Sequence, residues 1–92
     1  QQIIDYIQNH LECNLGLEEL ATIVQLSPQY FCEAFKRSTG MTPHQFVIHC
    51  RVERAKELLL RSNFSISDVA RQVGFADQSH LHRHFKRWVG VT

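Results

Sequence analysis

The stretch Gln78–Trp88, QSHLHRHFKRW, carries the pattern from which the fold of this chain can be worked out. Its apolar residues Leu81, Phe85 and Trp88 recur at the spacing of one helix face. Histidines, arginines and a lysine occupy the other faces. The pattern predicts an amphipathic helix that anchors on a core and presents positive charge to an anion. For a charge cluster alone, a solvated surface helix is the simpler interpretation.

An earlier, imperfect copy of the same pattern favours a functional helix. Residues 20–42 read LATIVQLSPQYFCEAFKRSTGMT, and residues 69–92 read VARQVGFADQSHLHRHFKRWVGVT. Both segments begin with an alanine-bearing run, contain a Phe-Lys-Arg triplet and close with Gly-x-Thr. The second copy has one extra residue near Ala76. Two copies of one short unit predict a single composite domain rather than a solenoid.

Two helix starts carry the same strong signal, a hydroxyl residue followed directly by proline. Ser27-Pro28 and Thr42-Pro43 each supply an N-cap and a proline at the first helical position. Ser65, followed three residues later by Asp68, resembles a capping box. Together with hydrophobic periodicity, these signals predict an all-helical chain without strands, with helices at residues 3–12, 17–24, 28–38, 43–61, 66–73 and 78–88.

Each unit contains two short helices joined by only about three residues, a connection that forces a steep crossing. The predicted fold class is therefore all-α, with two helix-turn-helix units joined by a long linker helix. Each unit with its neighbouring helix is similar to a homeodomain-like three-helix subdomain. The expected division is residues 1–42 for the first subdomain, 43–61 for the linker helix and 62–92 for the second subdomain.

The two tight turns differ at one informative position. The second unit has Gly74 at the end of a short helix, where glycine favours a left-handed cap. In the first unit the corresponding residue is Gln25. If the turns are alike, Gln25 adopts a left-handed conformation at a cost of about 1–2 kcal/mol.

Composition excludes several broad classes. With 92 residues, 43% of them hydrophobic, the chain suits one small domain or two subdomains of low individual stability. It contains no apolar run of membrane-spanning length and no visible signal peptide, so no membrane partner is expected. Its three cysteines are widely spaced, which argues against a disulfide framework and for a reducing, cytoplasmic setting: Cys13, Cys32 and Cys50.

Charge is distributed unevenly along the chain. The formal net charge is only +1, yet all ten lysines and arginines lie at or after Lys36. Most of the nine acidic residues precede that position. The asymmetry predicts an oriented electrostatic footprint with a basic C-terminal part. Such a face suits duplex DNA; the alternative is a helical protein-interaction adaptor whose basic C-terminal face binds an acidic protein.

The length of the linker helix fits the geometry of duplex DNA. Nineteen residues, 43–61, at about 1.5 Å each give roughly 28 Å of helix. Major-groove faces on one side of B-DNA are about 34 Å apart. With the widths of the flanking units added, the linker can set the helices 28–38 and 78–88 near this spacing, in successive major grooves.

Two ordered motifs identify a family. The first unit reads LA-x-x-V and then S-x-x-Y-F-x-x-x-F-K-x-x-x-G-x-T-P. The second reads I-x-x-V-A-x-x-V-G-F-x-D-x-S-x-L-x-R-x-F-K-x-x-x-G-x-T. Over essentially its whole length the chain resembles the DNA-binding domain of AraC/XylS-type transcriptional regulators. The family pattern continues beyond Thr92, so the second subdomain is expected to be truncated at its C-terminal end.

The resemblance implies partners and contact residues. The expected partners are double-stranded promoter DNA and RNA polymerase, with an effector or dimerisation domain outside this chain. Base-edge candidates are Pro28, Gln29, Cys32 and Glu33 in the first unit and Gln78, Ser79, His82 and Arg83 in the second. Candidates for the DNA backbone are Ser27, Lys36, Thr42, Lys86 and Arg87. Many family members carry a basic residue in place of Glu33, which repels phosphate but can accept a hydrogen bond from cytosine N4.

The histidines invite a metal site, but the sequence does not support one. His80 and His84 are four residues apart, yet no cysteine or carboxylate stands beside them at helical spacing. No metal or other cofactor is therefore expected, and the histidines are expected to be solvated or to face phosphate.

Neither stacking on single-stranded bases nor catalysis is favoured. Aromatics among cations can stack on bases, but here four large apolar residues have helical spacing and are expected in the core: Phe31, Phe35, Leu81 and Phe85. The chain has no nucleophile–histidine–acid grouping, glycine-rich phosphate loop or suitably spaced acid pair, so an enzyme is not expected.

Overall fold

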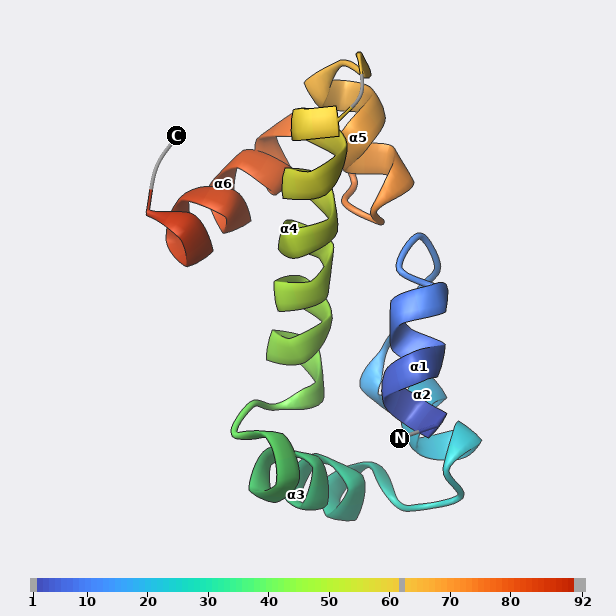
Figure 1. Ribbon diagram of the computed structural model, residues 1–92. Helices are drawn as coiled ribbons and strands as arrows, with labels where there is room; N and C mark the ends of the chain where they lie inside the picture. The colour runs from blue at the N-terminus through green and yellow to red at the C-terminus, as the bar shows by residue number, and fades with distance from the viewer. Residues whose placement is uncertain (1, 62, 91–92) are drawn as a thin grey trace.

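The computed structural model describes residues 2–61 and 63–90, and this part of the chain is helical with no strand. Its helices are α1 (Gln2–Asn9), α2 (Leu17–Ile23), α3 (Pro28–Thr39), α4 (Pro43–Arg61), α5 (Ile66–Gln72) and α6 (Gln78–Val89). Figure 1 shows α4 as the axis of the molecule, with α1–α3 around its first half and α5 and α6 around its second half. The predicted all-α class is confirmed.

One predicted boundary is wrong: the first helix ends at Asn9 and does not continue to residue 12. His10 Nδ1 donates a hydrogen bond of 2.8 Å to the Tyr6 carbonyl oxygen, within the last turn of α1. The chain then turns, but Leu11 remains buried in the core. The burial of Leu11 explains why the apolar periodicity extends beyond the helix itself.

The side-chain caps that the sequence predicts before α3 and α4 are present. Ser27 Oγ accepts a hydrogen bond from the Tyr30 N–H at 3.2 Å. Thr42 Oγ1 accepts from the Gln45 N–H at 3.2 Å, and the Thr42 N–H donates back to Gln45 Oε1 at 3.0 Å. These bonds satisfy N–H groups that have no partner within the helix, and so fix where each helix begins.

Two hydrophobic cores flank α4, and α4 contributes to both. The first core contains Val47 together with buried residues of α1–α3 and the α1–α2 loop. The second contains Ile48, Val52 and Ala55 together with buried residues of α5, α6 and the turn between them. Because successive residues of a helix point about 100° apart, Val47 and Ile48 can face different cores. One helix therefore holds both units.

The large apolar residues predicted for the core are mostly buried. Phe31 and Phe35 are 3% and 5% exposed, and Leu81 is 2% exposed. Phe85 is only half-buried but packs against the second core. Trp88, expected as a third anchor of its helix, is instead 37% exposed, with its ring 5.3 Å from the ring of His49. It lies at the margin of the interface between α6 and α4.

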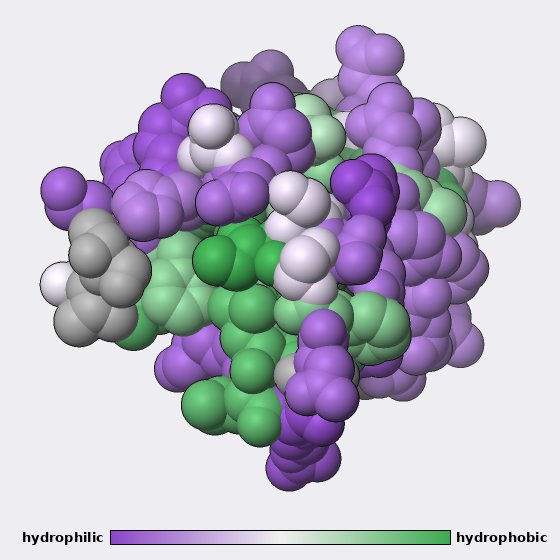
Figure 2. Space-filling view, turned by 90° about the horizontal axis from the view of Figure 1, so that it is seen from above, coloured by the Kyte–Doolittle hydropathy of each residue, from purple (hydrophilic) through white to green (hydrophobic). Residues whose placement is uncertain are grey.

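Apolar side chains also gather at the surface near the junction of α4 and α5. Leu60 is 85% exposed, and Phe64 and Ile66 are 47% and 46% exposed. Figure 2, which views the molecule from above, shows green hydrophobic surface among purple polar residues on this face.

The two helix-turn-helix turns have the same backbone conformation, as predicted. Gln25 has a φ of 61° and Gly74 has a φ of 98°, both in the left-handed region. In the first turn the Leu26 N–H donates to the Ala21 carbonyl at 3.0 Å, and in the second the Phe75 N–H donates to the Ala70 carbonyl at 2.9 Å. In the first unit, glutamine thus occupies a turn position whose positive φ favours glycine.

Gln25→Gly should therefore stabilise the protein by about 1 kcal/mol, because glycine adopts a positive φ without the steric cost of a Cβ atom. Chemical denaturation measures the effect. Glu57→Gly provides the control, since exposed Glu57 lies inside α4 and glycine in the middle of a helix should destabilise by about 0.5–1 kcal/mol. Equal destabilisation by both variants would contradict the strain at Gln25.

The two core phenylalanines should differ in the stability that they contribute. Phe35→Ala should lower the free energy of unfolding by about 3–5 kcal/mol, because its ring is almost completely buried. Phe85→Ala should cost less, since half-buried Phe85 leaves a partly solvated gap. Urea denaturation of both variants tests this order, and a larger loss at Phe85 would contradict it.

Candidate nucleic-acid interface

Helix α3 carries an exposed polar face opposite its core face. Phe31 and Phe35 point into the first core. The predicted contact residues Ser27, Pro28, Gln29, Glu33 and Lys36 are all exposed. Cys32, also predicted as a contact, is half-buried, so less of its side chain is open to a ligand than at Gln29 or Glu33.

Helix α6 presents a larger and more basic face. Leu81 fixes it on the second core. Every predicted contact residue on this helix is exposed: Gln78, Ser79, His82, Arg83, Lys86 and Arg87. Asp77 caps the helix through a 2.9 Å hydrogen bond from the His80 N–H to its carboxylate. The two sets of candidates lie on separate helices, not in one pocket: α3 lies below the first turn of α4, whereas α6 packs against the side of α4 (Figure 1).

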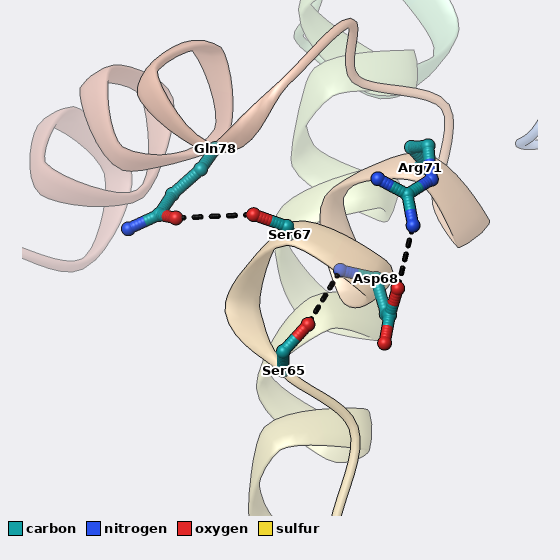
Figure 3. A network of polar contacts seen from close by, with 5 residues as sticks. All are labelled: Ser65, Ser67, Asp68, Arg71 and Gln78. Carbon is teal, nitrogen blue, oxygen red and sulfur yellow. Dashed lines mark hydrogen bonds and ion pairs between the residues drawn. The ribbon is translucent and has the colours of Figure 1, made fainter.

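The side chain of Gln78 is oriented by the preceding helix. Ser67 Oγ in α5 donates a 3.2 Å hydrogen bond to Gln78 Oε1. Figure 3 shows the amide nitrogen of Gln78 pointing away from Ser67, free to donate to a ligand. Sequence reasoning missed Ser67, because nothing in the pattern indicates which residue of α5 faces the start of α6.

The capping box predicted at the start of α5 is only partly formed. Ser65 Oγ accepts a 3.1 Å hydrogen bond from the Asp68 N–H, as expected. The Asp68 carboxylate, however, pairs with Arg71 one turn further along the helix (Figure 3). The resemblance to a capping box is therefore right for Ser65 and wrong for the returning carboxylate.

His80 and His84 are packing residues rather than freely solvated ones, which corrects the sequence expectation. Both are half-buried, and their rings lie 5.1 Å and 5.5 Å from the ring of buried Phe75. His80 Nδ1 also accepts a 3.3 Å hydrogen bond from the Ala76 N–H. These contacts hold the start of α6 against the turn that precedes it. Among the described residues, no group of three or more histidine, cysteine or acidic side chains could hold a metal ion.

A groove of about 560 Å³ separates the first half of α4 from the last turns of α6. Its lining contains no acidic residue and consists of Thr42, His44, Gln45, Ile48, His84, Arg87 and Trp88. Burial lowers the pKa of His84, and the nearby His80, Arg83, His44 and Arg87 lower that pKa further. The fold thus joins two predicted backbone contacts, Thr42 and Arg87, to His84 and to His44, which the sequence pattern did not single out.

Comparison with known proteins agrees with this geometry. A family model described as a helix-turn-helix domain matches residues 20–92. The regulatory protein PocR of Salmonella typhimurium is 37% identical over 92 residues, which cover 100% of this chain and 30% of PocR. The crystal structure of the DNA-binding domain of AdpA, in complex with a target DNA, is 32% identical, with a TM-score of 0.95 over 99% of this chain and 82% of that chain.

The chain belongs to the AraC/XylS-type DNA-binding domains. An AraC-type transcriptional regulator from Chromobacterium violaceum, 22% identical, has the same fold, with a TM-score of 0.90 over 98% of this chain and 80% of that one. This AraC/XylS-type domain spans about a third of the length of the curated relatives it matches. None of its helices in the described ranges is both long and apolar enough to cross a membrane.

The free domain should lose stability in mild acid partly through His84. Because the pKa of His84 is lowered by folding, the unfolded chain binds the proton more readily as the pH falls through the usual histidine range. Stability should therefore decrease between about pH 7 and pH 5, and His84→Gln should flatten the decrease. Denaturation at several pH values measures it. His82→Gln, at an exposed position of the same helix, is the control; equal flattening by both would contradict the assignment.

Proposed function

We propose that this chain binds double-stranded promoter DNA in a sequence-specific manner, with α3 and α6 in successive major grooves. The observation that carries the proposal is the pair of exposed polar faces on two separate helices, α3 before the first turn of α4 and α6 against the side of α4. The 19 residues of α4 extend roughly 28 Å, and the flanking units add to this separation. The sum is suited to major-groove faces about 34 Å apart.

The proposed roles follow from position on each helix. Residues near the helix starts and on the outer face read base edges: Gln29, Cys32, Glu33, Gln78, Ser79, His82 and Arg83. Residues at the caps and further along the helices hold the phosphate backbone: Ser27, Lys36, Thr42, Lys86 and Arg87. Arg83 suits guanine, whose O6 and N7 both accept from a guanidinium group. Glu33 suits cytosine, whose N4 group donates.

The two units contribute unequally in this proposal. α6 carries Arg83, Lys86 and Arg87 on its exposed surface, whereas α3 carries Lys36 and Arg37 close to the acidic Glu33. Phosphate contacts supply most of the non-specific affinity of DNA-binding proteins. We therefore assign more of the electrostatic affinity to the second unit and more discrimination to the first.

The remaining proposals concern the division of this chain and its place in a longer protein. We propose the division into residues 1–42, 43–61 and 62–92, of which residues 1, 62, 91 and 92 lie outside the described part of the chain. An effector or dimerisation domain outside this chain, contact with RNA polymerase and a cytoplasmic location are likewise proposals. The length of the curated relatives, about three times that of this chain, supports a further domain. The proposed activity is binding, with no catalytic step.

Arg83→Ala and Lys86→Ala should separate base reading from backbone contact. Arg83→Ala should weaken the cognate duplex by about 1–3 kcal/mol and relax the preference at one base pair. Lys86→Ala should weaken cognate and scrambled duplexes alike and lower the slope of log affinity against log salt by about one. The cognate duplex is first selected from a random pool with the wild-type chain. Both variants are then titrated against it and against a scrambled duplex at several salt concentrations.

Two outcomes would change the assignment. Equal weakening of both duplexes by Arg83→Ala, with a reduced salt slope, would make Arg83 a backbone contact. If neither variant changed duplex binding, the exposed basic face of α6 would be better explained as the surface of an adaptor for an acidic protein. Salt-sensitive binding of the wild-type chain that unrelated DNA competes poorly is the result expected for a specific DNA-binding domain.

A further inference from the structure

A polar contact from the middle of α4 holds the loop that follows α1. Arg51 Nε donates a 3.0 Å hydrogen bond to the Leu11 carbonyl oxygen, and Arg51 Nη2 donates a 2.8 Å bond to the Cys13 carbonyl oxygen. The guanidinium group is half-buried, and this burial lowers the pKa of Arg51. Arg51 thus satisfies two backbone acceptors at the point where α1 has stopped and the chain is no longer helical.

The turn of the second unit lies against the same carbonyl group. A Cβ atom added at Gly74 would overlap the Leu11 carbonyl oxygen and would come within 2.7 Å of Arg51 Nε. The α1–α2 loop of the first unit therefore touches the α5–α6 turn of the second. Figure 1 shows this loop rising beside α4 toward that turn. The contact lies to one side of α4, away from its axis.

This contact adds a restraint between the two units that α4 alone does not provide. The long helix sets the distance between the two units, but each unit is otherwise joined to it through its own core. A second attachment to one side of the axis prevents one unit from rotating about α4 relative to the other. Gly74 is also only four residues before Gln78, where α6 begins. A shift of this turn would therefore move the base-reading end of α6.

We propose that Arg51 and Gly74 are positioning residues that fix the rotation of the two helix-turn-helix units about α4, and thereby the spacing of the two DNA half-sites that the chain accepts. Neither residue is among those proposed to touch DNA. The inference rests on the proposed two-groove binding, and its test includes a measurement made without DNA.

The variants are chosen to separate the contact from general destabilisation. Arg51→Met keeps the length of the side chain and removes both donors. Gly74→Ala adds the overlapping methyl group, but it also strains a residue with a φ of 98°. Gly90→Ala is the matched control, because Gly90 has a φ of 85° and nothing within 4 Å of an added Cβ. Helix content by circular dichroism confirms folding; Arg51→Lys, which keeps the charge, replaces Arg51→Met if the latter unfolds.

The measurement without DNA is the relative orientation of the two units, from residual dipolar couplings of the amide groups. The wild-type chain and Gly90→Ala should fit a single alignment frame. Arg51→Met and Gly74→Ala should need separate frames for the α1–α3 unit and the α5–α6 unit. A single, unchanged frame in both of the latter variants would overturn the proposal.

The DNA measurement compares duplexes with both half-sites at the selected spacing, with one or two base pairs inserted between them, and with one half-site alone. Linking two sites typically raises affinity by about 10²–10⁴-fold. Arg51→Met should lose about 10-fold or more of that gain, with little change on the single half-site, and should discriminate less among spacings. Unaltered spacing preference would count against the proposal. If even the wild-type chain gained nothing from the second half-site, two-groove binding would fail, while the orientation measurement would still decide the role of Arg51.

Discussion

The burial of α4 on two sides is the constraint on which the rest of this structure depends. Val47 is buried in the first core, and the next residue, Ile48, is buried in the second, followed by Val52 and Ala55. A helix that faces two cores cannot tilt toward one without exposing apolar side chains of the other, and burying such a side chain is worth about 1.5–3 kcal/mol. The placement of α3 and α6 on separate units of the molecule follows from this shared helix.

The two units show that backbone geometry can be preserved while the residues that make it change. Gln25 and Gly74 adopt the same left-handed turn, and each turn is closed by a hydrogen bond back to an alanine carbonyl in the preceding helix. The turn sets the crossing of the helices that form each helix-turn-helix, so it is retained even with glutamine. The outer faces are under no such constraint, which is why α3 carries Glu33 where α6 is more basic.

Features governed by neighbours in the sequence could be predicted from it. The caps at Ser27 and Thr42 and the span of α4 depend on residues within a few positions of one another, and the structure confirms them. The left-handed turn at Gln25 was predicted differently, by comparison with Gly74 in the internal repeat, and the structure confirms it. The exposed candidates on α6 were also predictable, because the spacing of its apolar residues defines which face is left outside.

Features governed by distant residues could not be predicted in this way. The end of α1 depends on Arg51, which is 40 residues from Leu11, and the orientation of Gln78 depends on Ser67 in another helix. The groove that joins Thr42 to Arg87 exists only because α4 and α6 pack together. Periodicity correctly marked Leu11 as buried, but it could not distinguish a helical residue from one held in place by a side chain from elsewhere.

The unequal sharing of α4 also has a consequence for how the chain folds during synthesis. The first core draws one of its eight buried residues from α4, whereas the second core draws three of eight. Because ribosomes release the N-terminal part first, the first unit can assemble most of its interior before α4 is complete. The second unit must wait for α4 and use it as a template. A fragment that begins after α4 would lack three of the buried residues of its core, whereas a fragment that ends after α3 would lack one, together with the hydrogen bonds from Arg51 to the α1–α2 loop.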